Sequence, residues 1–212
     1  MTGSDAAGRR HRARRGDGDL LRAEILTAAA RLLHDRGDPA RVSIRAIAAA
    51  CGVTSPAIYL HFRDKESVFL EVCSEGFREF AARIESAASQ VDDPVAALGA
   101  AAKEYVRYAL ARPEQYRVLF LQRSPLPGGV DVDDLPGMST FRMLEGLIRR
   151  AIDSGVFRSV DPFLTATTFW LALHGIASRA VTEQGPPAFP WPAPEALTEY
   201  LVDGALHGLL AR

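Results

Sequence analysis

Cysteine is almost absent from the sequence, with two residues, Cys51 and Cys73, in a chain of 212. Two cysteines cannot form a disulfide framework, and neither has a second cysteine or a histidine at the spacing of a zinc site. The cysteine usage therefore predicts a protein of a reducing compartment. We also expect no metal and no other cofactor.

Long hydrophobic runs are missing as well. No stretch reaches the ~18 apolar residues of a membrane span, because the most apolar one, FLTATTFWLALHGIA (163–177), is interrupted by threonines and a histidine. No apolar segment of signal-peptide length follows the arginine-rich start. We expect a cytoplasmic protein that does not enter a membrane.

Lysine is scarce, with two residues against 23 arginines, and the formal net charge is only −1. That near-neutral total conceals an uneven distribution. Residues 1–70 carry 12 Lys and Arg against 8 Asp and Glu, whereas residues 71–212 carry 13 against 18. The excess of basic residues in the N-terminal part and of acidic residues in the C-terminal part indicates that any nucleic-acid contact belongs to the N-terminal part.

The sequence contains no segment with the two-residue period of a strand, whereas apolar residues recur at helical spacing throughout. We predict an all-α protein of about nine helices, with a disordered basic arm at 1–18, a helix-turn-helix domain at 19–64 and a helical effector-binding and dimerisation domain at 65–212. From the end of the helix-turn-helix domain onward, helices are expected at about 64–90, 94–111, 114–122, 137–154, 161–184 and 194–211. Pro- and Gly-rich segments separate them.

Two short helices in the first domain each begin with a recognisable start signal. Ser43 and Thr54 are expected to cap them, and each is preceded by a valine, Val42 or Val53, that can pack on an isoleucine inside the helix. Pro56 falls in the first turn of the second helix, where a missing N–H costs little. Helices this short need a platform, which the helix before them can supply.

A short helix pair of this kind presents the start of its second helix to the major groove of DNA. Two hydroxyls and two small apolar surfaces would meet base edges there, from Thr54, Ser55, Pro56 and Ala57. No arginine among them can grip guanine, so base recognition would depend on water, DNA shape and the arm. Whether the arginines of the arm contact DNA or form only a solvated tail is left open.

Phosphate contacts are expected around the same helix. Lys65 lies in the first turn of a helix, where its charge opposes the macrodipole, so helix stability does not favour it. Beside a phosphate, however, the ammonium group and the helix N-terminus attract the same anion. Further hydrogen-bonding groups come from Ser43, Arg45, Tyr59 and His61.

The run SIRAIAAACGVTSPAIYLHFRDKESVF (43–69) resembles the helix-turn-helix of the tetracycline-repressor (TetR) family. The family pattern of a cap and "IA", then "GV[ST]", "[IL]Y.HF" and "KE", is matched at fixed offsets over about 25 residues. The resemblance implies a homodimeric regulator that binds double-stranded operator DNA and is usually a repressor relieved by a small molecule. It places DNA contacts at Ser43, Thr54, Ser55, Pro56, Tyr59, His61 and Lys65.

The second domain resembles the same family more loosely, through "PEQYRVLF" and a Trp…His-Gly signature at Trp170, His174 and Gly175. An unknown small, mostly apolar effector is therefore expected. The large side chains that could line its pocket include Tyr105, Phe120, Phe141, Trp170 and His174. A packed tryptophan with a hydrogen-bonded core histidine is the alternative for the last two.

The last two helices carry small residues beside leucines, which lets helices approach closely. A two-fold pairing of these helices would form the homodimer interface, and the resemblance points to the same segment. Two other functions remain as alternatives: a small helical enzyme that uses His174, and an architectural DNA-binding protein without an effector. We expect no catalytic activity, because no nucleophile elbow, phosphate-binding loop or metal motif is present.

Overall fold

The computed structural model describes residues 17–121, 135, 137–183 and 189–210. Within these residues the prediction of an all-α fold with nine α-helices is confirmed, and the only extended pairing is a single bridge between Phe157 and Leu210. The helices are α1 (Asp17–Arg36), α2 (Ile44–Cys51), α3 (Ser55–Tyr59), α4 (Lys65–Ser89), α5 (Pro94–Ala111), α6 (Pro113–Tyr116), α7 (Met138–Asp153), α8 (Pro162–Thr182) and α9 (Pro194–Leu209).

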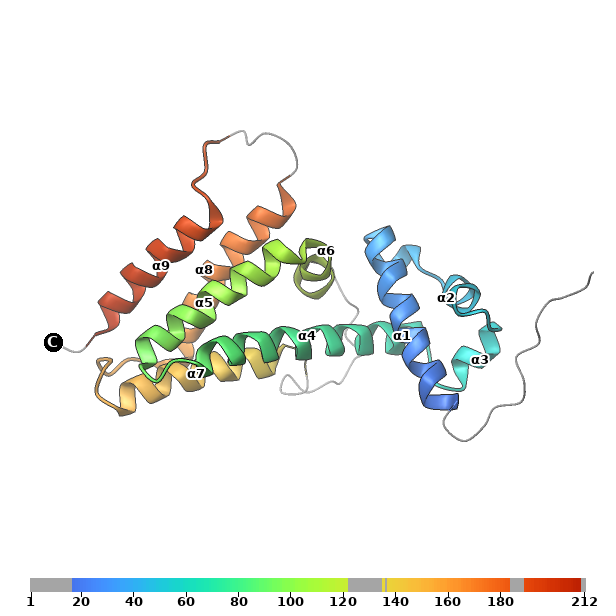
Figure 1. Ribbon diagram of the computed structural model, residues 1–212, viewed down its shortest axis with the longest axis horizontal. Coiled ribbons are helices and arrows are strands. Elements are labelled where there is room, and N and C mark those ends of the chain that lie inside the picture. The colour runs from blue at the N-terminus through green and yellow to red at the C-terminus, as the bar shows by residue number, and fades with distance from the viewer. Residues whose placement is uncertain (1–16, 122–134, 136, 184–188, 211–212) are drawn as a thin grey trace, which may run out of the picture.

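The molecule has two parts joined by one long helix (Figure 1). Helices α1, α2 and α3 form one end, α5 to α9 form the other, and α4 extends from the first part along the second. Buried side chains form two separate clusters: one spans Ile25 to Val72 and the other Cys73 to Leu206. The first two turns of α4 therefore belong to the N-terminal core, and the rest of the helix belongs to the C-terminal core.

Local signals explain the N-terminal part. α1 ends before Gly37, whose φ of 67° is the left-handed conformation that glycine adopts without strain. Ser43 caps α2 as predicted, since its Oγ accepts a hydrogen bond from the Ala46 N–H at 3.2 Å. Thr54 occupies the N-cap position of α3 but makes no side-chain cap, so α3 depends on packing of its buried Ile58.

Asp64 starts α4 with a reciprocal cap. Its carboxylate accepts from the Ser67 N–H at 2.7 Å, while the Asp64 N–H donates to the Ser67 hydroxyl at 3.2 Å. A short 3₁₀ turn at Pro39–Arg41 (η1) lies between α1 and α2. These features set the start of α4 and the turn between α1 and α2, while α2 packs on α1 and α3 packs on α2.

The segment after α5 differs from the predicted helix at 114–122. Only Pro113–Tyr116 is α-helical, and Arg117–Leu121 continues as a π-helix (η2). A π turn widens the backbone and re-aims successive side chains, and such turns are frequent at functional sites.

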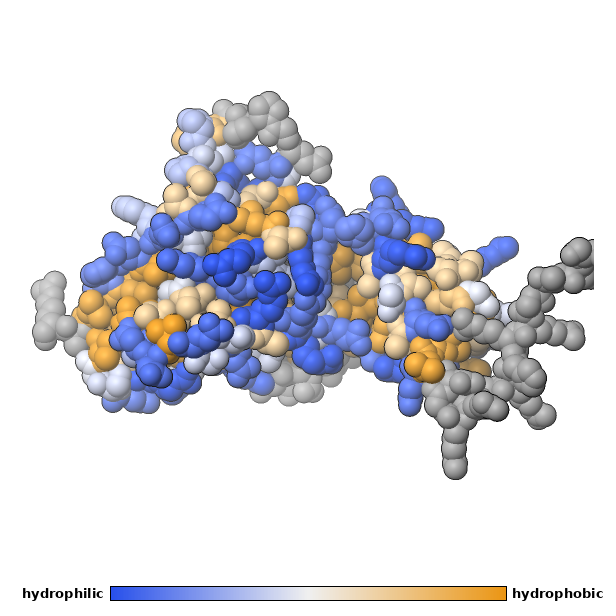
Figure 2. Space-filling model, in the orientation of Figure 1, coloured by the Kyte–Doolittle hydropathy of each residue, from blue (hydrophilic) through white to orange (hydrophobic). Residues whose placement is uncertain are grey.

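The surface in the orientation of Figure 1 is mainly hydrophilic, with hydrophobic side chains gathered over the N-terminal part and at the far end of the C-terminal part (Figure 2). In the described residues no helix is long and apolar enough to cross a membrane. The predicted arm at 1–18 falls largely outside them, and its last two residues belong to the first turn of α1.

Candidate functional site

Helices α2 and α3 present an exposed polar face at the N-terminal end of the molecule. Ser43, Arg45, Thr54, Pro56 and Tyr59 are exposed, and Tyr59 retains 54% of its surface although it is a large aromatic residue. Ser55 and Ala57, the other two residues predicted to face bases, are partly buried. The structure thus brings all the predicted base-facing residues onto one five-residue helix and its cap.

Lys65 and His61 lie at the margin of this face. Lys65 donates from Nζ to the Pro39 carbonyl oxygen at 3.2 Å, which holds its side chain next to η1 at the start of α4. An ammonium group has three donors, so two remain for other acceptors. A Cβ atom placed on Gly18 would lie 3.7 Å from the His61 ring, so His61 borders the first turn of α1.

The C-terminal part contains an apolar cavity of about 450 Å³. Its wall consists of side chains from α4, η2, α7 and α8 and from the residues just before α7, namely Phe77, Phe80, Phe120, Leu135, Gly137, Met138, Thr140, Phe141, Phe163, Thr167 and Trp170. Three of the five predicted pocket residues are among them: Phe120, Phe141 and Trp170. The volume falls within the range of about 300–1,000 Å³ typical of small-molecule sites.

Tyr105 and His174, the other two predicted pocket residues, belong to a polar cluster beside this wall. The hydroxyls of Tyr116 and Tyr105 lie 2.8 and 3.2 Å from His174 Nδ1, and 3.3 Å from each other. The His174 ring stacks on Trp170 with centroids 5.1 Å apart and contacts Phe120 at 5.6 Å. His174 is thus a partly buried, hydrogen-bonded histidine that contacts two residues of the cavity wall.

Burial favours the uncharged forms of these three side chains. It raises the pKa of Tyr105 and Tyr116 and lowers the pKa of His174 below its ordinary value of 6.5. A neutral imidazole can accept a hydrogen bond from a tyrosine hydroxyl at Nδ1, whereas an imidazolium cannot.

Acid is therefore expected to destabilise the protein through His174. Its pKa is depressed in the folded state, so below about pH 6.5 the unfolded chain binds more protons and the free energy of unfolding falls as the pH decreases. The melting temperature between pH 7.5 and 5.0 tests this. His174→Gln should flatten the profile.

Several cavity residues that the sequence did not suggest come from α4 and the start of α8. Phe77 and Phe80 belong to the apolar stripe of α4, which predicted a helix facing a core. Phe163 keeps 59% of its surface, although its ring lies 5.5 Å from Phe141. Helical periodicity identifies such residues as inward-facing but does not indicate that the space between them is unfilled.

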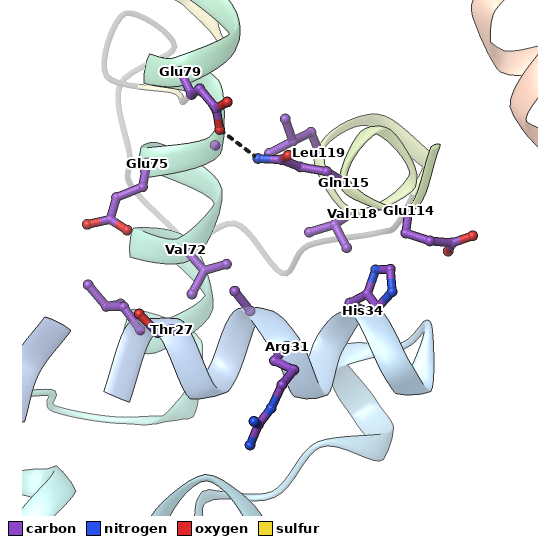
Figure 3. A pocket seen from close by; sticks show the side chains of 13 residues that line it. Thr27, Arg31, His34, Val72, Glu75, Glu79, Glu114, Gln115, Val118 and Leu119 are labelled. Atoms are coloured by element: carbon purple, nitrogen blue, oxygen red, sulfur yellow. Dashed lines mark hydrogen bonds between the residues drawn. The ribbon is translucent and has the colours of Figure 1, made fainter. Parts of the chain in front are cut away.

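A second cavity, of about 440 Å³, lies where the two parts meet. Figure 3 shows His34 on α1 lying opposite Val118 on η2, with Glu79 of α4 hydrogen-bonded to Gln115 at 3.3 Å. Val118 packs against the N-terminal core as well as the C-terminal one. Because Phe120 lines the apolar cavity two residues later, η2 touches both the apolar cavity and the N-terminal core.

No group of three or more His, Cys, Asp or Glu side chains in the part of the chain that the structure describes is arranged to hold a metal ion. Both cysteines are buried as thiols, and burial raises the pKa of Cys73 to about 11.

Two family models match the sequence. Residues 25–72 match the model described as bacterial regulatory proteins of the tetR family, and residues 98–205 match the tetracyclin repressor-like C-terminal domain. No curated protein matches the sequence.

Solved structures share the fold over most of the chain. The TetR family transcriptional regulator PfmR from Thermus thermophilus is 25% identical, with a TM-score of 0.61 over 88% of this chain and 99% of that one. FadR from Bacillus subtilis, in complex with stearoyl-CoA, is 17% identical (TM-score 0.70; 88% and 98%). AibR, in complex with isovaleryl coenzyme A and operator DNA, is 23% identical (TM-score 0.60; 90% and 98%).

Proposed function

The chain belongs to the tetR family of bacterial regulatory proteins, and we propose that it is a homodimeric repressor whose release from operator DNA is triggered by a small apolar effector. The observation that carries the proposal is the connection of an exposed, polar recognition face to an apolar cavity through α4 and η2. A regulator that binds the chromosome would act in the cytoplasm.

In the proposed DNA complex, α3 enters the major groove. Thr54, Ser55, Pro56 and Ala57 face base edges, and phosphates are bound by Ser43, Arg45, Tyr59, His61 and Lys65. Exposure of Thr54, Pro56 and Tyr59 supports these roles, as does the position of Lys65 at the N-terminus of α4, where the helix dipole favours an anion. Two such helices in a dimer would occupy half-sites ~34 Å apart.

We propose that the dimer forms through α8 and α9. On α8 four exposed residues follow one helical face, at Leu164, Thr168, Leu171 and Gly175. On α9 an exposed face contains Tyr200, which keeps 83% of its surface, together with Gly204 and Gly208. A Cβ atom added to either glycine would meet no other atom within 4 Å, so this face is open. An apolar face with small residues fits close packing against its symmetry mate.

The effector would act by favouring one of two arrangements of the DNA-facing part. A ligand shifts an equilibrium only by its differential affinity for the two states. Phe120 in the cavity wall and Val118 against the N-terminal core are both on η2, so displacement of this segment would move both. The Trp170 and His174-Gly175 signature would then mark the subgroup to which this C-terminal domain belongs.

Fluorescence anisotropy with the protein's own upstream DNA and a scrambled fragment tests the DNA-binding role. Lys65→Ala should weaken binding to both fragments and reduce the salt slope by about one, because one phosphate contact is lost. Lys103→Ala is the matched control, since this other lysine lies on α5 and pairs with Glu199 at 3.5 Å.

Tyr59→Phe provides a second variant, which removes only the hydroxyl from an exposed ring and should weaken binding severalfold. Failure of the parent protein to bind any DNA at low salt would refute the regulator and restore the enzyme hypothesis. Binding that no small molecule ever relieves would favour an architectural protein instead.

A further inference from the structure

The wall of the apolar cavity restricts the chemistry of its ligand. Six of its eleven described lining residues are aromatic, and none carries a charge. Among the described lining residues a carboxylate or phosphate would find no opposite charge to offset the loss of its hydration, which is unfavourable. Ring systems, in contrast, would gain edge-to-face and stacked contacts with the phenylalanines and Trp170.

The same wall contains a polar group without a partner. Thr140 is only 9% exposed, and its Oγ1 makes no hydrogen bond. The other threonine of the wall, Thr167, donates to the Phe163 carbonyl oxygen at 2.8 Å. Thr140 therefore differs from its neighbour in having an unused hydroxyl.

Thr140 lies in the first turn of α7, which begins at Met138, and its buried hydroxyl makes no bond back along the helix of the kind that Thr167 makes. Rotation about the Cα–Cβ bond exchanges the methyl and hydroxyl groups between staggered positions. The hydroxyl can thus turn toward a ligand without displacement of the backbone.

We propose that the effector is an uncharged ring compound bearing one hydroxyl or carbonyl group, and that Thr140 hydrogen-bonds to this group. The inference rests on the proposed function of this cavity as the effector site. It assigns a ligand class different from the acyl-coenzyme A esters bound by the FadR and AibR structures.

Isothermal titration calorimetry with four probes tests the proposal: 2-naphthol, naphthalene, 2-naphthoate and decanoyl-CoA. In the full-length protein 2-naphthol should bind about tenfold more tightly than naphthalene, which corresponds to one net hydrogen bond. Both anions should bind at least tenfold more weakly than 2-naphthol.

Variants assign the preference to Thr140. Thr140→Val should abolish the difference between 2-naphthol and naphthalene without changing the affinity for naphthalene, and Thr140→Ser should retain it. Thr182→Val is the matched control, because it removes an exposed α8 hydroxyl that bonds to the Ser178 carbonyl oxygen. Equal binding of 2-naphthol and naphthalene, tighter binding of either anion, or no binding of 2-naphthol would overturn the proposal.

The effector role of the cavity is tested separately by adding 2-naphthol to the protein–DNA complex. Selective binding that depends on Thr140 but leaves DNA affinity unchanged would establish the ligand class and refute effector control. Release of DNA by decanoyl-CoA, with no binding of 2-naphthol, would support effector control and refute the ligand class.

Discussion

Replacing Ile58 with alanine is expected to weaken specific DNA binding strongly while the C-terminal cavity persists. Ile58 is fully buried in α3, a helix of five residues without a side-chain cap, so packing of this side chain holds the helix in place. Truncation of a buried isoleucine costs about 2–5 kcal/mol. That is a large share of the stability of a small domain, and the C-terminal cluster does not include Ile58.

The graded control is Ile58→Val, which removes one methyl group and should cost about 0.5–1.5 kcal/mol. Anisotropy would report a loss of at least about 100-fold in DNA affinity for Ile58→Ala, equivalent to about 2.7 kcal/mol, and a much smaller one for Ile58→Val. Circular dichroism would show that most helix remains. Parent-like DNA affinity of Ile58→Ala would show that α3 does not depend on this contact.

The helix-turn-helix could be predicted because its determinants are local. Ser43 caps the helix that follows it, Asp64 begins α4, and Gly37 ends α1, each through atoms within a few residues. The order of such signals along the chain fixes three helix boundaries before any tertiary contact is considered. Thr54 marks the limit of this reasoning, because an N-cap residue type indicates the boundary but not the hydrogen bond.

The cavity was harder to predict because it depends on contacts between distant segments. Phe120, Phe141 and Trp170 were expected as large residues that could line one pocket. They lie on three different elements, η2, α7 and α8, and the space left between these elements depends on how the whole bundle packs. The change from α-helix to π-helix after Tyr116 has no local signal that we recognise. Tyr116 itself was missed, although its hydroxyl makes the shortest bond to His174 in the polar cluster.

Replacing Phe80 with alanine is expected to produce a large loss of stability in the C-terminal part. Phe80 is 1% exposed, and its ring contacts Tyr105, Tyr108 and Phe120 at centroid distances of 5.1, 4.9 and 5.3 Å. Phe→Ala in a core costs about 3–5 kcal/mol, which for a chain of this size lowers the melting temperature by roughly 10 °C.

The matched control is Phe163→Ala, which removes the same atoms from the cavity wall at a residue that is 59% exposed, so its cost should stay below about 1 kcal/mol. Thermal denaturation of both variants separates the two roles of the wall. A similar loss in both would mean that the wall is stabilised mainly by contacts that the isolated chain does not contain, such as those of the dimer. A large loss for Phe80→Ala alone would show that one side of the cavity is rigid core and the other, at the start of α8, is free to adjust when a ligand binds.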